Sequence, residues 1–306
     1  MIYNTGRKRV VAVLMGGWSS EREVSLDSGQ AVVNALSQSS YEPIAIDVDR
    51  DIGKLLQQLT PRPDVIFNAL HGFGGEDGVI QGLLESLHIP YTHSGVLASA
   101  LGMDKVTSRE LFIKGGMLVP LSRLVSHADF MRALPFPLPF VIKPRFEGSS
   151  RSVCILETTK DYDDLCQNWP YGDEALVEEY LSGREIHVAV MGDRALGAIE
   201  IIPKKQFYDY EAKYTDGCAD HIMPAPIPGQ DYQKALDLAL RAHQLLGCRG
   251  VTRSDFIYKQ EQFYLLEINT QPGMTALSLV PEIAAYNGIS FQQLIEWMIL
   301  EARCDQ

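Results

Sequence analysis

The chain of 306 residues is 46% hydrophobic, enough to bury a sizeable core in about two or three domains. Its formal net charge of −12 argues against a general nucleic-acid or anionic-membrane surface, because such partners need clustered Lys and Arg. Five scattered cysteines show neither zinc nor redox spacing and indicate reduced thiols in a cytoplasmic protein, and no stretch approaches the roughly twenty apolar residues of a membrane span.

The amino-terminal third alternates short apolar runs with amphipathic segments, which is typical of a parallel α/β layer. Ser20 and Glu23 have the spacing of a capping box and predict the start of a helix that continues to about Leu36. The apolar runs, each expected to form a buried strand, cover residues 10–15, 43–48 and 65–70.

A second unit is expected to begin near residues 103–105, and a third near the apolar strand 185–191. Strands are predicted over 140–143 and 175–178 in the second unit. The third unit should contain an amphipathic helix over 232–246 and a closing helix. Ser290 and Gln293 predict the start of that closing helix as a capping box.

Residues 253–269 carry the densest chemistry and predict a β-hairpin with a turn near 259–262. Side chains alternate along a strand, so pairing Asp255 with Glu267 places Arg253 opposite Asn269 and brings all four groups to one patch. Two carboxylates and an amide are oxygen ligands that Mg²⁺ accepts together with substrate phosphates. The alternative is a solvated polar face of an edge hairpin.

The loop after the predicted strand 140–143 is a candidate phosphate-binding lid. Lys143 stands at the strand end, and residues 145–150 are rich in backbone and hydroxyl donors. A plain surface loop is the alternative. Lys105 and Lys213 are further isolated cations that, considered alone, are typical of solvated surface lysines. The sequence contains no P-loop, and residues 71–78 do not complete a dinucleotide fingerprint.

In this order along the chain, several segments resemble those of D-alanine:D-alanine ligases, a branch of the ATP-grasp superfamily. The segments are 16–29, 71–78, 103–105, 143–150, 208–214, 253–275 and 278–281. The resemblance implies an α/β fold in which an amino-terminal open parallel α/β domain precedes a two-subdomain ATP-grasp fold of α+β type. The implied limits are 1–103 for the substrate-binding domain, 104–186 for the central subdomain and 187–306 for the carboxy-terminal subdomain with the metal site.

The resemblance also implies roles for single residues. ATP phosphates would meet Lys105, Lys143 and Lys213, adenine would meet Glu178 and the Leu181 backbone, and ribose would meet Glu185. Two Mg²⁺ ions, with Mn²⁺ as a substitute, would be held by Asp255, Glu267 and Asn269. The first D-alanine would be bound by Glu21, Val24 and His71, and the second by Arg253, Ser278 and the Leu279 backbone. Glu21, Ser149 and Tyr214 would form a hydrogen-bonded triad that closes a loop over the site.

The resemblance implies ATP-dependent synthesis of D-alanyl-D-alanine through an acylphosphate, for peptidoglycan precursors. It also implies that the chain forms a homodimer. Tyr214 is expected to go with D-alanine rather than D-lactate as the second substrate. A ligase for other amino acids, a catalytically silent relative and a plain structural α/β protein are the alternatives. The retained lysines, Arg253 and the acidic set argue against a silent relative.

Three positions depart from the family pattern. Arg151 and Ser152 replace an apolar residue and a glycine after the Glu-Gly-Ser-Ser segment, and the change to Ser152 restricts the backbone if the loop needs a positive φ there. Thr252 replaces the glycine before Arg253, which a strand should tolerate because threonine favours β structure.

Overall fold

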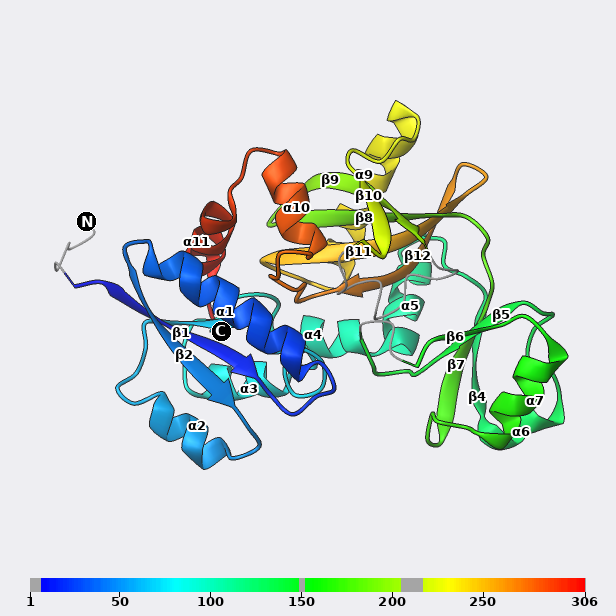
Figure 1. Cartoon of the computed structure of the whole chain (residues 1–306), viewed down its shortest axis with the longest axis horizontal. Coiled ribbons are helices and arrows are strands. Elements are labelled where there is room, and N and C mark those ends of the chain that lie inside the picture. Colours follow the sequence, from blue (N-terminus) through cyan, green and yellow to red (C-terminus); the bar gives the residue numbers. More distant parts are fainter. Residues whose placement is uncertain (1–6, 149–151, 205–216, 306) are drawn as a thin grey trace.

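The computed structural model describes residues 7–148, 152–204 and 217–305. Its strands form three sheets, one after another along the chain, with helices packed on them (Figure 1). The first sheet is parallel and the other two are antiparallel. The predicted combination of a parallel α/β layer followed by α+β units is therefore confirmed. The predicted limits at 103 and 186 stay predictions.

The first unit is a three-stranded parallel sheet in the order β2-β1-β3. Each strand is an apolar run of the kind the sequence predicted, and β1 and β3 are almost completely buried. The elements are β1 (Arg9–Gly16), α1 (Arg22–Ser37), β2 (Tyr41–Val48), α2 (Ile52–Gln58), β3 (Val65–Asn68), α3 (Val79–Ser86) and α4 (Val96–Met103).

The predicted capping box at Ser20 and Glu23 is wrong. Helix α1 begins at Arg22, Glu21 occupies the N-cap position, and its side chain makes no capping bond. Ser19 organises the turn instead, because its hydroxyl accepts a hydrogen bond from the Glu21 amide and donates one to the His71 carbonyl. The helix entrance is therefore joined to the loop that follows β3.

The second unit holds a four-stranded antiparallel sheet in the order β4-β7-β5-β6. Its elements are α5 (Lys105–Lys114), β4 (Ser122–Ser126), α6 (His127–Arg132), β5 (Phe140–Lys143), β6 (Cys154–Leu156), α7 (Thr159–Gln167) and β7 (Glu174–Glu179). A small aromatic core around Phe130 and Phe140 supports this sheet.

The third unit is a five-stranded antiparallel sheet in the order β10-β9-β8-β11-β12. The predicted hairpin register is confirmed, since Arg253 pairs with Asn269 and Asp255 with Glu267. The elements are β8 (Arg184–Met191), β9 (Arg194–Pro203), β10 (Ala219–Ile222), α9 (Gly229–Leu245), β11 (Val251–Lys259), β12 (Gln262–Asn269), α10 (Leu279–Tyr286) and α11 (Phe291–Glu301). The predicted capping box at Ser290 and Gln293 is present at the start of α11.

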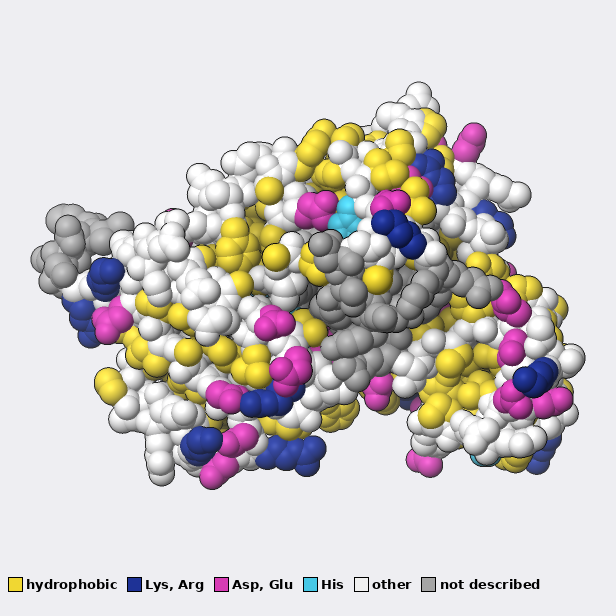
Figure 2. Space-filling view, in the orientation of Figure 1, with side chains coloured by type: hydrophobic (Ala, Val, Ile, Leu, Met, Phe, Trp, Pro, Cys, Tyr) yellow, Lys and Arg dark blue, Asp and Glu magenta, His cyan; other side chains and the backbone are white. Residues whose placement is uncertain are grey.

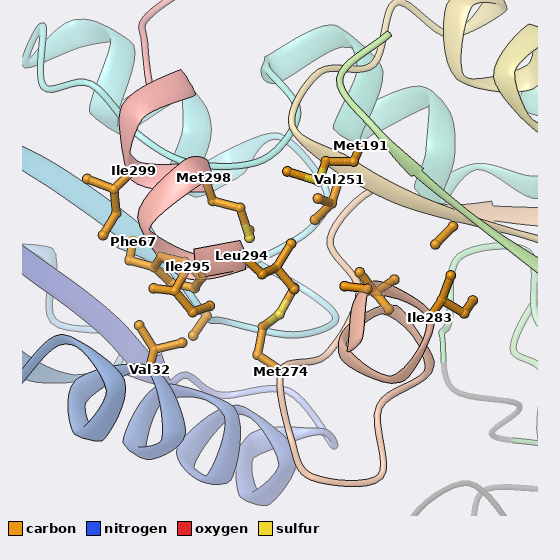
Figure 3. Packing of buried hydrophobic residues seen from close by; sticks show 14 of the residues in the cluster. Val32, Phe67, Met191, Val251, Met274, Ile283, Leu294, Ile295, Met298 and Ile299 are labelled. Carbon is orange, nitrogen blue, oxygen red and sulfur yellow. The ribbon is translucent and has the colours of Figure 1, made fainter. Parts of the chain in front are cut away.

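One hydrophobic cluster joins the first unit to the third. Helix α11, the last in the chain, packs against α1 and β3 near the amino terminus. In Figure 3, Ile295 lies beside Phe67 and Val32, and Leu294 lies beside Met274. Because these apolar side chains come from both ends of the chain, their burial holds the two units together.

The surface carries its charges in small mixed groups. On the face drawn in Figure 2, Lys and Arg side chains are scattered among Asp and Glu side chains. Within the described ranges, none of the helices combines the length and the apolar character needed to cross a membrane. The predicted cysteine chemistry is consistent with the structure, since the five cysteines are free thiols.

Truncating Ile295 should destabilise the joint between the first and third units. Its side chain is fully buried, and Ile→Ala at such a site removes transfer energy and leaves a cavity, which lowers the free energy of unfolding by about 2–5 kcal/mol. Urea unfolding of Ile295→Ala measures the loss. The control is Leu300→Ala on the same helix, because Leu300 is 66% exposed and should cost under about 0.5 kcal/mol. Equal losses in the two variants would contradict the proposed joint.

Candidate active site

Two adjoining cavities lie where the three units meet. The larger has a volume of about 380 Å³ and the smaller about 70 Å³. Lys105, Glu147 and Glu267 line both cavities, so the two spaces share a border. A ligand in the larger cavity can therefore present one end to a second ligand in the smaller one.

The smaller cavity collects predicted residues from five separate segments. The start of α1, the loop after β3, the start of α5, the β11–β12 hairpin and the start of α10 each contribute to it. The predicted residues among its lining are Glu21, His71, Lys105, Arg253, Glu267, Asn269, Ser278 and Leu279. Residues separated by more than half of the chain thus face one space.

The larger cavity lies between the second and third sheets. Its lining comes from β5, β7, β8, β9 and the hairpin strands, together with the segment that joins β7 to β8. The predicted residues among its lining are Lys105, Lys143, Glu178, Leu181, Glu185, Asp255 and Glu267.

Four predicted residues are not placed at either cavity. Val24 is buried in α1 and is absent from the lining of both, because its side chain packs into the protein. Ser149, Lys213 and Tyr214 lie outside the described residues. The roles implied for them stay predictions.

Asp255 is held by Arg253 and His187. Arg253 donates from Nε to Oδ1 and from an Nη to Oδ2, both at 2.7 Å, and His187 Nδ1 lies 2.7 Å from Oδ1. Burial opposes ionisation of Asp255, but Arg253 and His187 hold its pKa well below its usual range. His187 also approaches Glu185 at 3.0 Å. The sequence analysis missed His187, although its position two residues after Glu185 on a predicted strand places both on one face.

Glu178 is buried between two cations at the wall of the larger cavity. Its Oε1 accepts from Arg109 at 2.7 Å, and its Oε2 pairs with Lys143 at 2.8 Å. A buried carboxylate is stable only when it is paired in this way. Arg109 is a second residue that sequence reasoning missed, because it stands on helix α5 among positions that carry no motif.

Lys105 begins helix α5 and is buried at the border of the two cavities. Its ammonium donates to the Glu147 carbonyl. Burial lowers the pKa of Lys105, while the nearby Glu267 carboxylate acts in the opposite direction. An anionic ligand beside Lys105 would stabilise the charged form of this lysine, which burial disfavours.

His71 and Glu21 both line the smaller cavity. Glu76 Oε1 lies 2.6 Å from His71 Nδ1 and raises the pKa of His71, although burial acts in the opposite direction. The Glu21 side chain lies close to Gly72 in the loop after β3. A Cβ on Gly72 would lie 2.6 Å from Glu21 Oε2, and Gly72 has a φ of +67°. Only glycine allows this close approach.

The departures from the family pattern have structural consequences. Ser152 has a φ of +54°, so this residue adopts the left-handed backbone conformation that glycine adopts without strain. In that conformation a residue with a Cβ is less stable than glycine by about 1 kcal/mol. Thr252 is fully buried in β11, and its hydroxyl lies 2.8 Å from His243 Nδ1 on α9. The strand therefore tolerates Thr252, as expected, and gains a side-chain partner.

The hairpin residues suit a divalent cation that is shared with a ligand. Asp255 and Glu267 pair across the hairpin, and Asn269 lies two positions along the same strand face as Glu267. Across the described ranges, no group of three or more His, Cys, Asp or Glu residues gathers in a metal-binding arrangement. Two carboxylates and an amide oxygen fit Mg²⁺, because that ion usually takes one or two carboxylates plus substrate phosphates.

Family models and individual relatives that match this chain all carry the name of one enzyme family. A model described as "D-ala D-ala ligase C-terminus" matches residues 125–300, and one described as "D-ala D-ala ligase N-terminus" matches 10–60 and 53–94. The D-alanine–D-alanine ligase of Paramagnetospirillum magneticum is 52% identical, with 96% of this chain and 99% of that protein covered. The ligase of Granulibacter bethesdensis is 50% identical, with 97% and 98% covered.

Solved structures of a D-alanine–D-alanine ligase have a similar fold. The D-alanine–D-alanine ligase of Bacillus anthracis in complex with ATP superposes with a TM-score of 0.82 at 30% identity, covering 96% of this chain and 97% of that one. A second structure of that enzyme gives 0.85 at 31% identity, with the same coverage. The fold is that of an ATP-grasp ligase. The chain belongs to the D-alanine–D-alanine ligase family.

Acid should lower the free energy of unfolding through His243, which contacts Thr252 behind the site. Burial lowers the pKa of His243 to about 4, against 6.5 for the ordinary side chain. The folded protein keeps His243 neutral while the unfolded chain gains a proton below about pH 6.5, so this term loses about 2 kcal/mol of stability between pH 7 and pH 5. Urea unfolding of the wild type and His243→Asn at both pH values checks this. The stability difference between them should shrink in acid, and parallel pH curves would contradict it.

Proposed function

We propose that the chain joins two D-alanine molecules to D-alanyl-D-alanine, with hydrolysis of ATP to ADP and phosphate, for peptidoglycan precursors. The single observation that carries the proposal is the shared border of the two cavities. Lys105, Glu147 and Glu267 line both, so a nucleotide phosphate and an amino-acid carboxylate can meet there. The family membership and the ATP complex of the Bacillus anthracis relative support the same activity.

ATP would occupy the larger cavity. Lys105 and Lys143 would meet its phosphates, because both are buried lysines that line that space. Glu178 and the Leu181 backbone would contact adenine, and Glu185 the ribose hydroxyls. Lys213, outside the described residues, would clamp the phosphate that is transferred. Because many carboxylates also line this cavity, the two lysines are local partners for phosphate oxygens rather than part of a general positive surface.

Asp255, Glu267 and Asn269 would hold Mg²⁺, two ions by family resemblance, with Mn²⁺ as a substitute. When bound, the metal would neutralise charge on the phosphates. The protein contributes the orientation of its ligands. Arg253 and His187 keep Asp255 ionised and fixed, and the Gln271 amide donates to Asn269 Oδ1 at 2.9 Å.

The reaction would run in two steps in the smaller cavity. The carboxylate of the first D-alanine, near Glu21 and His71, attacks the γ-phosphorus of ATP, which forms the acylphosphate and releases ADP. The deprotonated amine of the second D-alanine attacks the acyl carbon. The tetrahedral intermediate then expels inorganic phosphate and leaves the peptide bond. No covalent enzyme intermediate is needed.

Arg253 would stabilise the oxyanion of the tetrahedral intermediate, with Ser278 and the Leu279 backbone beside the second substrate. Its guanidinium lines the smaller cavity while its ion pair with Asp255 fixes its orientation. Preorganised donors of this kind need no rearrangement as charge develops. Glu21, Ser149 and Tyr214 would close a loop over the site, and the exclusion of water would protect the acylphosphate from hydrolysis. The enzyme would act in the cytoplasm as a homodimer.

Phosphate release from Mg²⁺-ATP tests the activity directly. D-alanine should stimulate release, the product mass should be that of the dipeptide, and D-lactate should not compete near neutral pH. L-alanine and D-serine, offered separately, are the matched controls. Removal of divalent metal with EDTA should abolish release, and added Mg²⁺ or Mn²⁺ should restore it. Release that needs another amino acid would indicate a different ligase, and ATP binding without release would indicate a silent relative.

Replacing Arg253 with methionine should lower kcat by about 10²- to 10³-fold, because the oxyanion loses a fixed donor. Thermal unfolding must be measured alongside, since Asp255 also loses its partner. Arg194→Met is the matched control, because Arg194 is exposed at the start of β9 and lines neither cavity. A kcat for Arg253→Met within about twofold of the wild type would exclude the proposed role.

A further inference from the structure

A cluster of buried carboxamides lies directly behind the smaller cavity. Asn68 at the end of β3 and Gln81 on α3 belong to the first unit, and Gln271, after β12, belongs to the third. Asn68 and Gln81 have no exposed surface, and Gln271 is 1% exposed. A buried amide that loses a hydrogen bond pays a desolvation cost, so the contacts made by Asn68 and Gln271 matter, whereas Gln81 Oε1 makes no hydrogen bond within the described residues.

Gln271 bonds to the first unit through both ends of its side chain. Its Oε1 accepts from Asn68 Nδ2 at 3.0 Å, and its Nε2 donates to the Leu70 carbonyl. Leu70 immediately precedes His71. The partners are 203 and 201 residues away in sequence, so these bonds form only when the two units are assembled.

The backbone of the same residue holds the hairpin end. The Gln271 amide donates to Asn269 Oδ1 at 2.9 Å. One residue therefore bonds to the segment that carries His71 on one side and to Asn269 on the other. Asn68 extends the contact, because its Nδ2 also donates to the Gly75 carbonyl at 3.0 Å.

We propose that Gln271 is a positioning residue that fixes the His71 loop, residues 70–76, against the end of strand β12. The proposal rests on the proposed function, in which that loop bounds the site of the first D-alanine and the strand end bounds the site of its partner. Acyl transfer needs the reacting atoms at near-contact distance, and a displacement of about 1 Å can cost about 10²-fold in rate. A rigid link between the two walls meets that need.

A purely structural role would have a different signature. A buried carboxamide that only satisfies its neighbours would change stability when replaced, with no selective effect on the amino-acid substrates. Gln81 supplies the comparison inside the same cluster. Its Nε2 donates to the Gly75 carbonyl at 2.8 Å, on the same loop, but it belongs to the first unit alone.

The test compares Gln271→Met, Asn68→Leu and Gln81→Met in the full-length chain. Each replacement keeps the approximate side-chain size and removes the carboxamide. For Gln271→Met and Asn68→Leu we expect kcat/KM for D-alanine to fall at least about tenfold while KM for ATP stays within about twofold. In the double variant the loss should be smaller than the product of the single losses, because both remove one shared contact. Gln81→Met should leave kcat/KM for D-alanine within about twofold.

Hydrogen exchange gives a readout that does not need turnover. Asn68→Leu should speed exchange in residues 268–274, about two hundred residues away in sequence, whereas Gln81→Met should speed it only in the first unit. Unchanged exchange in 268–274, or kinetic losses that follow the fall in melting temperature equally in all variants, would overturn the inference. If Gln271→Met does not fold, Gln271→Asn, which keeps the carboxamide on a shorter stem, takes its place with the same expected direction.

The wild-type assay separates the two proposals. A wild-type chain that makes no dipeptide overturns the proposed function, and with it the assignment of the two walls to amino-acid sites. A wild-type chain that makes the dipeptide while Gln271→Met retains full kcat/KM for D-alanine overturns the positioning role alone.

Discussion

The buried ion pair between Arg253 and Asp255 is the interaction on which the site depends. Both groups lie on strand β11, and removing one member of such a pair leaves an uncompensated buried charge, typically at a cost of about 3–5 kcal/mol. Asp255 faces the larger cavity and Arg253 the smaller, so the pair connects the two spaces. His187 on β8 completes the set and ties it to Glu185.

The ion pair stays in place because rigid elements surround it. Strand β11 is the fourth of five strands and pairs on both sides, with β8 and β12. Behind the sheet, α9 packs against β8 and contributes His243, which meets Thr252. The Thr252 hydroxyl therefore links the strand that carries Arg253 to α9.

The two walls of the smaller cavity belong to different units, so their spacing depends on assembly. The α11 helix joins the units by apolar burial, which is strong but has little direction. The Gln271 contacts add directional hydrogen bonds at the cavity itself. Lys105 and Glu147 of the second unit meet Glu267 of the third at the border of the cavities, so all three units contribute to one site.

Local pattern determined much of this protein. Alternation and turn residues predicted the strands and the hairpin, and the period of two residues set which side chains of Arg253, Asp255, Glu267 and Asn269 share a face. Motif order predicted the family. Only the tertiary structure decided what lies against these residues. His187 and Arg109 lie outside the motifs, and the motif that contains Gln271 did not indicate its contacts. Their partners Asp255, Glu178 and Asn68 are between 68 and 203 residues distant in sequence. Contacts between remote segments depend on how the sheets pack, which no local period records.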